Sequence, residues 1–216
     1  MDYATLISIF KRGQKIINTL IFLWLQNQTF YRALQRSAVE PLGSTNKANQ
    51  TWADIGCSTG LLTRLVHQLN YHVTGYDLNT LSLKVAKLLS LHQKNIDYKN
   101  KDFNTLDEKF DVISATSLLS VVEDKKQSLN KLITMLKNSD STLILIEPTE
   151  KLSVKNVYTL IHDIKTFWFY KGLLLWAKAR EGKAIPESLF ENIDAVNIQH
   201  TYYISDMVRI TYIKKS

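Results

Sequence analysis

A glycine-rich turn between a short, mostly apolar run and a segment with helical spacing constrains the fold more than any other part of the chain. Residues 52–55 form the run, Gly56 and Gly60 bracket the turn, and apolar side chains recur at helical spacing over residues 61–69. Glycines in such a turn leave backbone N–H groups open at a helix N-terminus, where the helix dipole favours negative groups. The stretch predicts a strand, a loop and a helix that together bind a small molecule.

The order of residues in this turn narrows the choice of ligand. Ser58 stands where the dinucleotide-binding pattern G-x-G-x-x-G needs its second glycine, and no P-loop lysine follows Gly60. The order Asp54-x-Gly56-x-Ser58-x-Gly60 instead resembles the first motif of the class I S-adenosylmethionine-dependent methyltransferases, in which an acidic residue precedes alternating glycines. The resemblance implies that S-adenosyl-L-methionine is the cofactor and that Asp54, Gly56, Cys57, Ser58 and Gly60 bind it. A glycine-rich turn in another kind of α/β protein is the alternative.

Asp77 is the acidic residue that best fits a contact with the ribose of a nucleotide. It ends the β-branched run 72–77 and lies 17 residues after Gly60, close to the spacing of about 20 at which such a residue meets a ribose. A carboxylate can accept hydrogen bonds from both vicinal hydroxyls. We expect Asp77, with the neighbouring Leu78, to bind the cofactor. The alternative is that Asp77 caps the helix predicted for residues 81–91, a role that Asn79 would fill equally well.

Asp102 and Phe103 follow the next predicted strand, residues 96–99. In the family that the chain resembles, an acidic residue here accepts from the adenine amino group and its neighbour packs on the ring. The resemblance implies these roles for Asp102 and Phe103. A turn aspartate beside a core phenylalanine is the competing interpretation.

The fourth predicted strand and the loop at its end span residues 110–119. Residues 114–117 should border the transferred methyl group, because ligands of open α/β sheets lie outside the carboxyl ends of the strands. Ala115 and Thr116 are the predicted cofactor contacts here. The segment lacks the Asn/Asp-Pro-Pro-aromatic pattern of enzymes that methylate exocyclic base amines. Methylation of cytosine C5 needs a cysteine near this loop, whereas Cys57 is the single cysteine of the chain. Both nucleic-acid subclasses are therefore disfavoured.

The alternation of strand and helix patterns predicts an α/β fold. Five alternations end at residues 142–148, a continuous apolar run typical of a strand covered on both faces. Alternating residues 195–213 then predict a β-hairpin. With the resemblance, we expect a Rossmann-like seven-stranded methyltransferase sheet with helices on both faces, an N-terminal helical segment and a C-terminal antiparallel hairpin. The expected parts of this single domain are a helical cap (1–45), a cofactor-binding core (50–150), a long aromatic cap helix (151–190) and the hairpin (191–216).

Composition and charge limit the number of domains, the kinds of binding partner and the cellular location that we expect. The chain has 216 residues, which suits one domain, and a formal net charge of +7. The excess of Lys and Arg lies in residues 1–50 and 151–216, where it favours an anionic substrate, a membrane surface or nucleic acid, or simply aids solubility. The single cysteine and the short apolar run at residues 20–25, well below the ~20 residues of a spanning helix, favour a cytoplasmic location.

A long helix is predicted for residues 154–180, where aromatic side chains and lysines are interleaved. A core helix with outward lysines is the favoured interpretation, and a membrane surface or partner protein bound through residues 157–176 is the alternative. Tyr158 and His162 on this helix are the candidate general bases. The five histidines are scattered without metal-ligand spacing, so no metal is expected.

Methyl transfer from a sulfonium needs collinear donor and acceptor in a water-poor pocket more than it needs an acid or base. The sequence thus predicts a methyltransferase acting on a small, lipophilic or aromatic metabolite through an oxygen or nitrogen acceptor. One alternative is an RNA methyltransferase that uses the basic flanks. The other is a non-catalytic adaptor, or a membrane-associated subunit, that binds S-adenosylmethionine without turnover.

Overall fold

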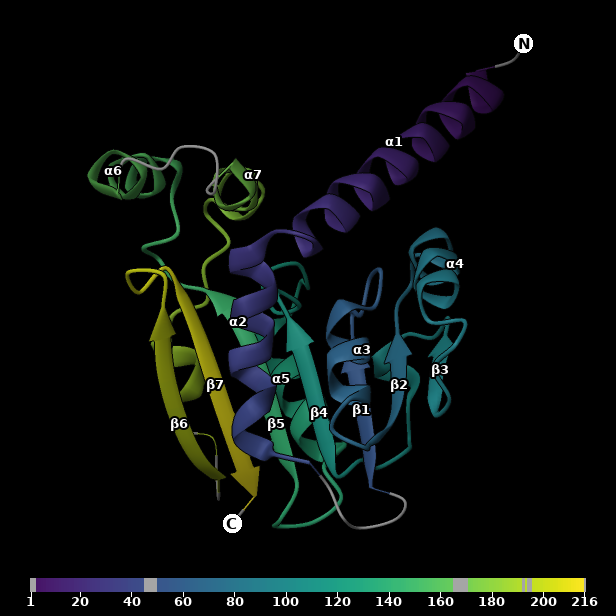
Figure 1. Cartoon of the computed structure of the whole chain (residues 1–216), viewed down its shortest axis with the longest axis vertical. Helices are drawn as coiled ribbons and strands as arrows, with labels where there is room; N and C mark the ends of the chain where they lie inside the picture. The colour runs from purple at the N-terminus through teal and green to yellow at the C-terminus, as the bar shows by residue number, and fades with distance from the viewer. Residues whose placement is uncertain (1–2, 45–49, 165–170, 192, 194–195, 216) are drawn as a thin grey trace.

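One seven-stranded sheet forms the centre of the computed structural model, which describes residues 3–44, 50–164, 171–191, 193 and 196–215 (Figure 1). The strands are β1 Thr51–Ile55, β2 His72–Tyr76, β3 Ile96–Lys99, β4 Val112–Thr116, β5 Thr142–Pro148, β6 Val196–Tyr203 and β7 Val208–Lys215. Their order is β3-β2-β1-β4-β5-β7-β6. The first five are parallel, and β7 lies antiparallel to both β5 and β6. This topology confirms the predicted fold class.

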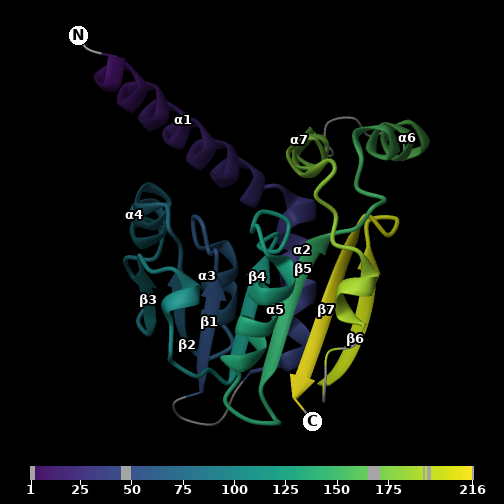
Figure 2. The same cartoon turned by 180° about the vertical axis from the view of Figure 1, so that it is seen from behind.

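Helices cover both faces of the sheet. They are α1 Tyr3–Gln26, α2 Thr29–Val39, α3 Leu61–His67, α4 Thr80–Leu89, α5 Lys125–Thr134, α6 Val154–Ile164 and α7 Lys171–Arg180. Helices α2 and α3 lie on one face and α5 on the other (Figures 1 and 2). All seven residues of β5 are buried, with Ile144 and Ile146 in one hydrophobic core and Leu143 and Leu145 in the other. The apolar run predicted as a doubly covered strand is therefore confirmed.

The start of α4 is capped by Asn79 rather than by Asp77. The Asn79 side chain accepts hydrogen bonds from the backbone N–H groups of Leu81 and Ser82, at 3.1 and 3.3 Å. An asparagine at this position stabilises a helix by satisfying N–H groups that have no partner within the helix. The capping role considered as the alternative for Asp77 is thus filled by its neighbour.

The single long helix predicted for residues 154–180 is wrong. The structure has two helices there, α6 and α7, which lie side by side (Figures 1 and 2). Residues 165–170, with most of the aromatic run, lie outside the described residues. Trp176 of the second helix is buried, with 2% of its surface exposed. Its ring lies edge-on to that of Tyr31 of α2, with 5.4 Å between the ring centroids. One straight helix of this length would carry much of that apolar surface into water.

Helix α1 contacts the body of the protein with its C-terminal half and projects away from it toward its N-terminus (Figure 1). Thr19 lies 3.2 Å, oxygen to oxygen, from the Ser82 hydroxyl of α4, and the Asn79 side chain donates to Thr19 at 3.3 Å. About two helical turns after Thr19, Gln26 accepts a hydrogen bond from Thr59 in the glycine-rich turn. This half of α1 therefore runs from α4 to the turn after β1.

Candidate cofactor and acceptor site

The turn between β1 and α3 has a backbone that alternates into the left-handed region. The φ angles are 72° at Gly56, 49° at Ser58 and 76° at Gly60. At Gly60 a Cβ atom would collide with the ring and hydroxyl of Tyr98, so a residue without a side chain is required there. Ser58, where the family motif has glycine, takes up the backbone conformation that glycine favours. Ser58 is therefore a non-glycine residue with a positive φ, which is uncommon.

The Asp77 carboxylate joins this turn to the end of β2. Its Oδ2 accepts from the Ser58 backbone N–H at 2.8 Å, and its Oδ1 accepts from the Asn79 backbone N–H at 2.7 Å. Burial raises the pKa of Asp77, and these two hydrogen bonds oppose the increase. Each carboxylate oxygen can accept a further hydrogen bond. Asp77 also lines a large cavity, so that remaining capacity is available to a ligand.

This large cavity has a volume of about 1150 Å³ and opens at the carboxyl ends of β1, β2 and β4. Ligand pockets commonly measure about 300–1,000 Å³, so it has room for a cofactor and an acceptor together. Leu78, 68% exposed, lies at its mouth, and Asp102 and Phe103 line another wall. Asp102 accepts from the backbone and side chain of Asn104, at 2.9 and 3.0 Å. Its turn role and its predicted adenine contact are therefore compatible.

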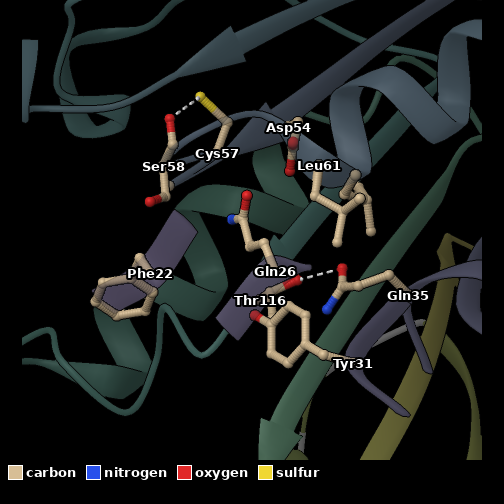
Figure 3. Close-up of a pocket in the computed structure, with 11 residues that line it drawn as sticks. Phe22, Gln26, Tyr31, Gln35, Asp54, Cys57, Ser58, Leu61 and Thr116 are labelled. Atoms are coloured by element: carbon tan, nitrogen blue, oxygen red, sulfur yellow. Dashed lines mark hydrogen bonds between the residues drawn. The ribbon is translucent and has the colours of Figure 1, made fainter. Parts of the chain in front are cut away.

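A second, narrow cavity lies between the glycine-rich turn and helices α1 and α2 (Figure 3). Phe22 and Gln26 from α1, Tyr31 and Gln35 from α2, and Thr116 from β4 lie around it. Phe22 and Thr116 line the large cavity as well, so the two spaces meet at the end of β4.

Asp54 lies beneath the turn with both oxygens engaged. Its Oδ2 accepts from the Thr63 hydroxyl at 2.6 Å, and its Oδ1 accepts from the Ser114 hydroxyl at 3.2 Å. Burial raises the pKa of Asp54 to about 6, and these hydrogen bonds oppose the increase. The side chain thus links β1 to α3 and β4 while still forming part of the narrow cavity wall.

Most of the sequence-predicted cofactor residues meet at these two cavities. The lining residues among them are Asp54, Gly56, Cys57, Ser58, Asp77, Leu78, Asp102, Phe103 and Thr116. Gly60 and Ala115 do not line either space, and Ala115 is fully buried in the core beneath. The structure does not bring Tyr158 or His162 to the cavities. Tyr158 is 53% exposed on α6, and the His162 side chain is 91% exposed beside Asp163.

A buried polar cluster that the sequence analysis did not identify lies behind the end of β4. Glu147 of β5 is 1% exposed, and its Oε1 accepts from the Leu119 backbone N–H at 2.8 Å. Its Oε2 is buried without a hydrogen-bond partner in the described structure, as is the Nε of Arg180, which lines the large cavity. Burial raises the pKa of Glu147 to about 8 and lowers that of Arg180. The sequence signal was an acidic residue inside an apolar strand.

Two further polar groups beside Thr116 have unused hydrogen-bonding capacity. The Gln35 Oε1 accepts from the Thr116 hydroxyl at 3.1 Å, but the Gln35 Nε2 has no partner in the described structure. The Ser117 hydroxyl is likewise buried and unpartnered there. Buried polar atoms are nearly always paired in folded proteins, so these positions indicate where a ligand or water completes the site.

Comparisons with known proteins agree with this geometry. Residues 53–139 match the sequence family described as "Methyltransferase domain". The chain is 30% identical over 180 residues to a ubiquinone biosynthesis O-methyltransferase from Colwellia psychrerythraea, covering 74% of this chain and 70% of that protein. To the enzyme of that name from Idiomarina loihiensis it is 38% identical over 78 residues, and there it spans 32% of that protein and 34% of this chain.

Solved structures share the fold at low sequence identity. The plantazolicin methyltransferase BpumL in complex with SAH superposes with a TM-score of 0.64 at 13% identity, over 95% of this chain and 90% of that chain. The N-methyltransferase NodS from Bradyrhizobium japonicum, in complex with S-adenosyl-L-homocysteine, gives a TM-score of 0.54 at 14% identity over 88% and 89% of the two chains. At these identities the likeness concerns the fold.

Proposed function

Because the chain belongs to the class I S-adenosylmethionine-dependent methyltransferases, we propose that it methylates a hydroxyl group of a small, lipophilic or aromatic acceptor. The observation that carries the proposal is that the predicted cofactor site adjoins a polar end of the large cavity at Thr116. The glycine-rich turn and Asp77 form the predicted cofactor site, and buried polar atoms without hydrogen-bond partners in the described structure lie at that end of the cavity. The hydroxyl acceptor is inferred from the relatives, which are named as O-methyltransferases.

The residues of this chain fit the cofactor. Asp77 would accept from the ribose hydroxyls, since it has lone pairs left after binding the Ser58 and Asn79 N–H groups. Asp102 and Phe103 would bind the adenine, and the methionine end would lie in the large cavity where it meets the narrow one, by Phe22 and Thr116. S-adenosylmethionine supplies a methyl group already activated by its sulfonium, so the protein's task is to orient the acceptor and exclude water.

The acceptor end of the cavity combines apolar and polar walls. Phe22, Leu118 and Val122 provide apolar surface for a lipophilic or aromatic ring. Ser117 and Arg180 provide donors that can orient a hydroxyl. Glu147 acts as a positioning residue, because it holds the segment after β4 through the Leu119 N–H and does not itself line the cavity.

Transfer of a radiolabelled methyl group from S-adenosylmethionine to a panel of lipophilic phenols and catechols tests the proposal. We expect turnover with at least one phenolic hydroxyl and none with the matching compounds in which that hydroxyl is replaced by hydrogen. Labelling of RNA in place of every phenol, or labelling of an amine panel alone, would contradict the hydroxyl acceptor.

The roles of Tyr158 and His162 as general bases stay predictions. Substitution of His162 tests whether this residue accepts a proton during the reaction. A base must come within hydrogen-bond reach of the proton that it accepts. Since the His162 side chain is 91% exposed on α6, we expect His162→Gln to keep kcat within about twofold of the wild type. A fall of about 10²-fold or more, typical for loss of a general base, would show that α6 closes over the acceptor.

A further inference from the structure

One face of α1 carries large apolar side chains that the rest of the protein leaves exposed. They are Ile16, Ile17, Leu20, Ile21 and Trp24, with exposed fractions between 36% and 58%. Their separations of one, three and four residues place them along one side of a helix. We call these five residues the outer face of α1. Contiguous apolar surface of this kind marks an interaction site in a folded protein.

The opposite side of α1 is already in use. Asn18 and Phe22 line the large cavity, and Thr19 and Gln26 hydrogen-bond to α4 and to the glycine-rich turn. The outer face therefore points away from the sheet. Both overall views show the N-terminal half of α1 projecting beyond the other elements, as a continuation of the half that carries the outer face (Figures 1 and 2).

The charge of α1 selects among the partners that could cover an apolar face. Its sequence contains Lys11, Arg12 and Lys15 and no acidic residue. At 100° per residue, Lys15 lies opposite the centre of the outer face, so α1 has one apolar and one basic side, as do helices that lie along anionic lipid surfaces. Such a surface offers an acyl boundary for the apolar side chains and negative headgroups for the cations beside it. Trp24 is of the type enriched at such boundaries.

We propose that α1 docks the protein on an anionic lipid surface through its outer face. Within the described residues no helix is long and apolar enough to cross a membrane, so α1 would lie along the surface. The proposal does not rest on the acceptor assigned above. If both hold, the mouth of the large cavity, bordered by Asn18 and Phe22 on the other side of α1, lies close to the lipid.

Co-sedimentation of the full chain with lipid vesicles tests this docking. One set of vesicles contains phosphatidylcholine alone and the other contains 30% phosphatidylglycerol, each at low and high salt. The variant Ile17→Glu/Leu20→Glu places two charges on the outer face, at residues 52% and 58% exposed. The control variant Leu88→Glu/Leu89→Glu makes the same kind of change on α4, at residues 65% and 46% exposed. Circular dichroism verifies the fold of each variant.

We expect the wild type and the α4 variant to bind the anionic vesicles, and the α1 variant to lose about tenfold or more of the partition coefficient. High salt and phosphatidylcholine alone should weaken binding of the wild type. Absence of wild-type binding, or equal binding by both variants, would overturn the proposal. A wild-type dimer that becomes a monomer in the α1 variant, seen by light scattering, would instead make the outer face an interface between copies.

Discussion

Ser58 occupies a glycine position of the family motif and has a positive φ. Its φ of 49° is one that side chains rarely adopt, and its backbone N–H is fixed by Asp77 at 2.8 Å. We expect Ser58→Gly to relieve backbone strain of about 1 kcal/mol, part of which is offset by the greater freedom of glycine in the unfolded chain. The variant should therefore unfold at an equal or slightly higher urea concentration and keep its affinity for S-adenosylhomocysteine.

The control for Ser58→Gly is a serine-to-glycine change at a position whose backbone φ is not positive. Ser139→Gly lies in an exposed turn whose φ is not positive, so it should be neutral or slightly destabilising. If Ser58→Gly lowered stability more than Ser139→Gly, the Ser58 side chain would have to make a contact worth more than the strain.

Glu147 should make stability depend on pH. Its pKa is about 8 in the folded protein because of burial, against 4.5 normally, so above pH 4.5 the unfolded state releases a proton that the folded state keeps. The free energy of unfolding should therefore fall as pH rises between about 5 and 8. Asp54, with a pKa of about 6, contributes in the same direction but at lower pH.

Thermal unfolding of Glu147→Gln between pH 6 and 8 measures this contribution. Glutamine cannot ionise, so the slope of Tm against pH should be smaller in the variant than in the wild type over this interval. An exposed acid, Glu150, provides the control, and Glu150→Gln should leave the slope unchanged. Identical slopes for all three proteins would mean that Glu147 ionises normally in its buried position.

The site residues that could be predicted from the sequence lie close together along the chain, whereas those that could not be predicted come from distant elements. Asp77 and the turn residues lie at fixed distances along one strand-loop-helix-strand unit, so their pattern is visible in the sequence. Glu147, Gln35 and Arg180 come from β5, α2 and α7, and their placement around the end of β4 depends on how distant elements pack. No spacing rule joins them, although an acid in an apolar strand was a usable signal.

At the scale of elements, close packing of α7 on the corner between α1 and α2 depends on Gly172. A Cβ atom there would lie 2.9 Å from the Gln28 Cγ and 3.0 Å from a carbon of the Phe30 ring. We expect Gly172→Val to destabilise the protein by about 1–3 kcal/mol through overpacking. In urea unfolding, Gly13→Val is the matched control, because nothing lies within 4 Å of that position on α1.

The outcome at these two glycines separates packing from helix propensity. Valine is a better helix former than glycine, so Gly13→Val should be neutral or stabilising by a few tenths of a kcal/mol. Equal effects at both positions would mean that α7 does not pack closely on this corner. The break between α6 and α7 was not predictable from periodicity, because residues 154–180 keep an apolar pattern while the packing partner of α7 comes from the far end of the sequence.

For the whole molecule, alternating strand and helix patterns predicted an α/β fold with a terminal β-hairpin, and the resemblance to the methyltransferase family implied the seven-stranded sheet to which that hairpin adds. Each strand-helix unit is local, and the handedness of parallel connections limits how such units can be arranged. The position of α1 was not predictable in this way. Its placement depends on Thr19 meeting Ser82 and on Gln26 meeting Thr59, contacts between residues far apart in the chain.

Equilibrium binding of S-adenosylhomocysteine, measured by isothermal titration calorimetry, tests the central claim most directly. We predict one site per chain for the wild type, unchanged affinity for the exposed-residue control Asp97→Ala, and at least a tenfold weaker affinity for Asp77→Ala, because the ribose hydroxyls and the Ser58 N–H lose their acceptor. Absence of binding by the folded wild type, or full affinity in Asp77→Ala, would contradict the account.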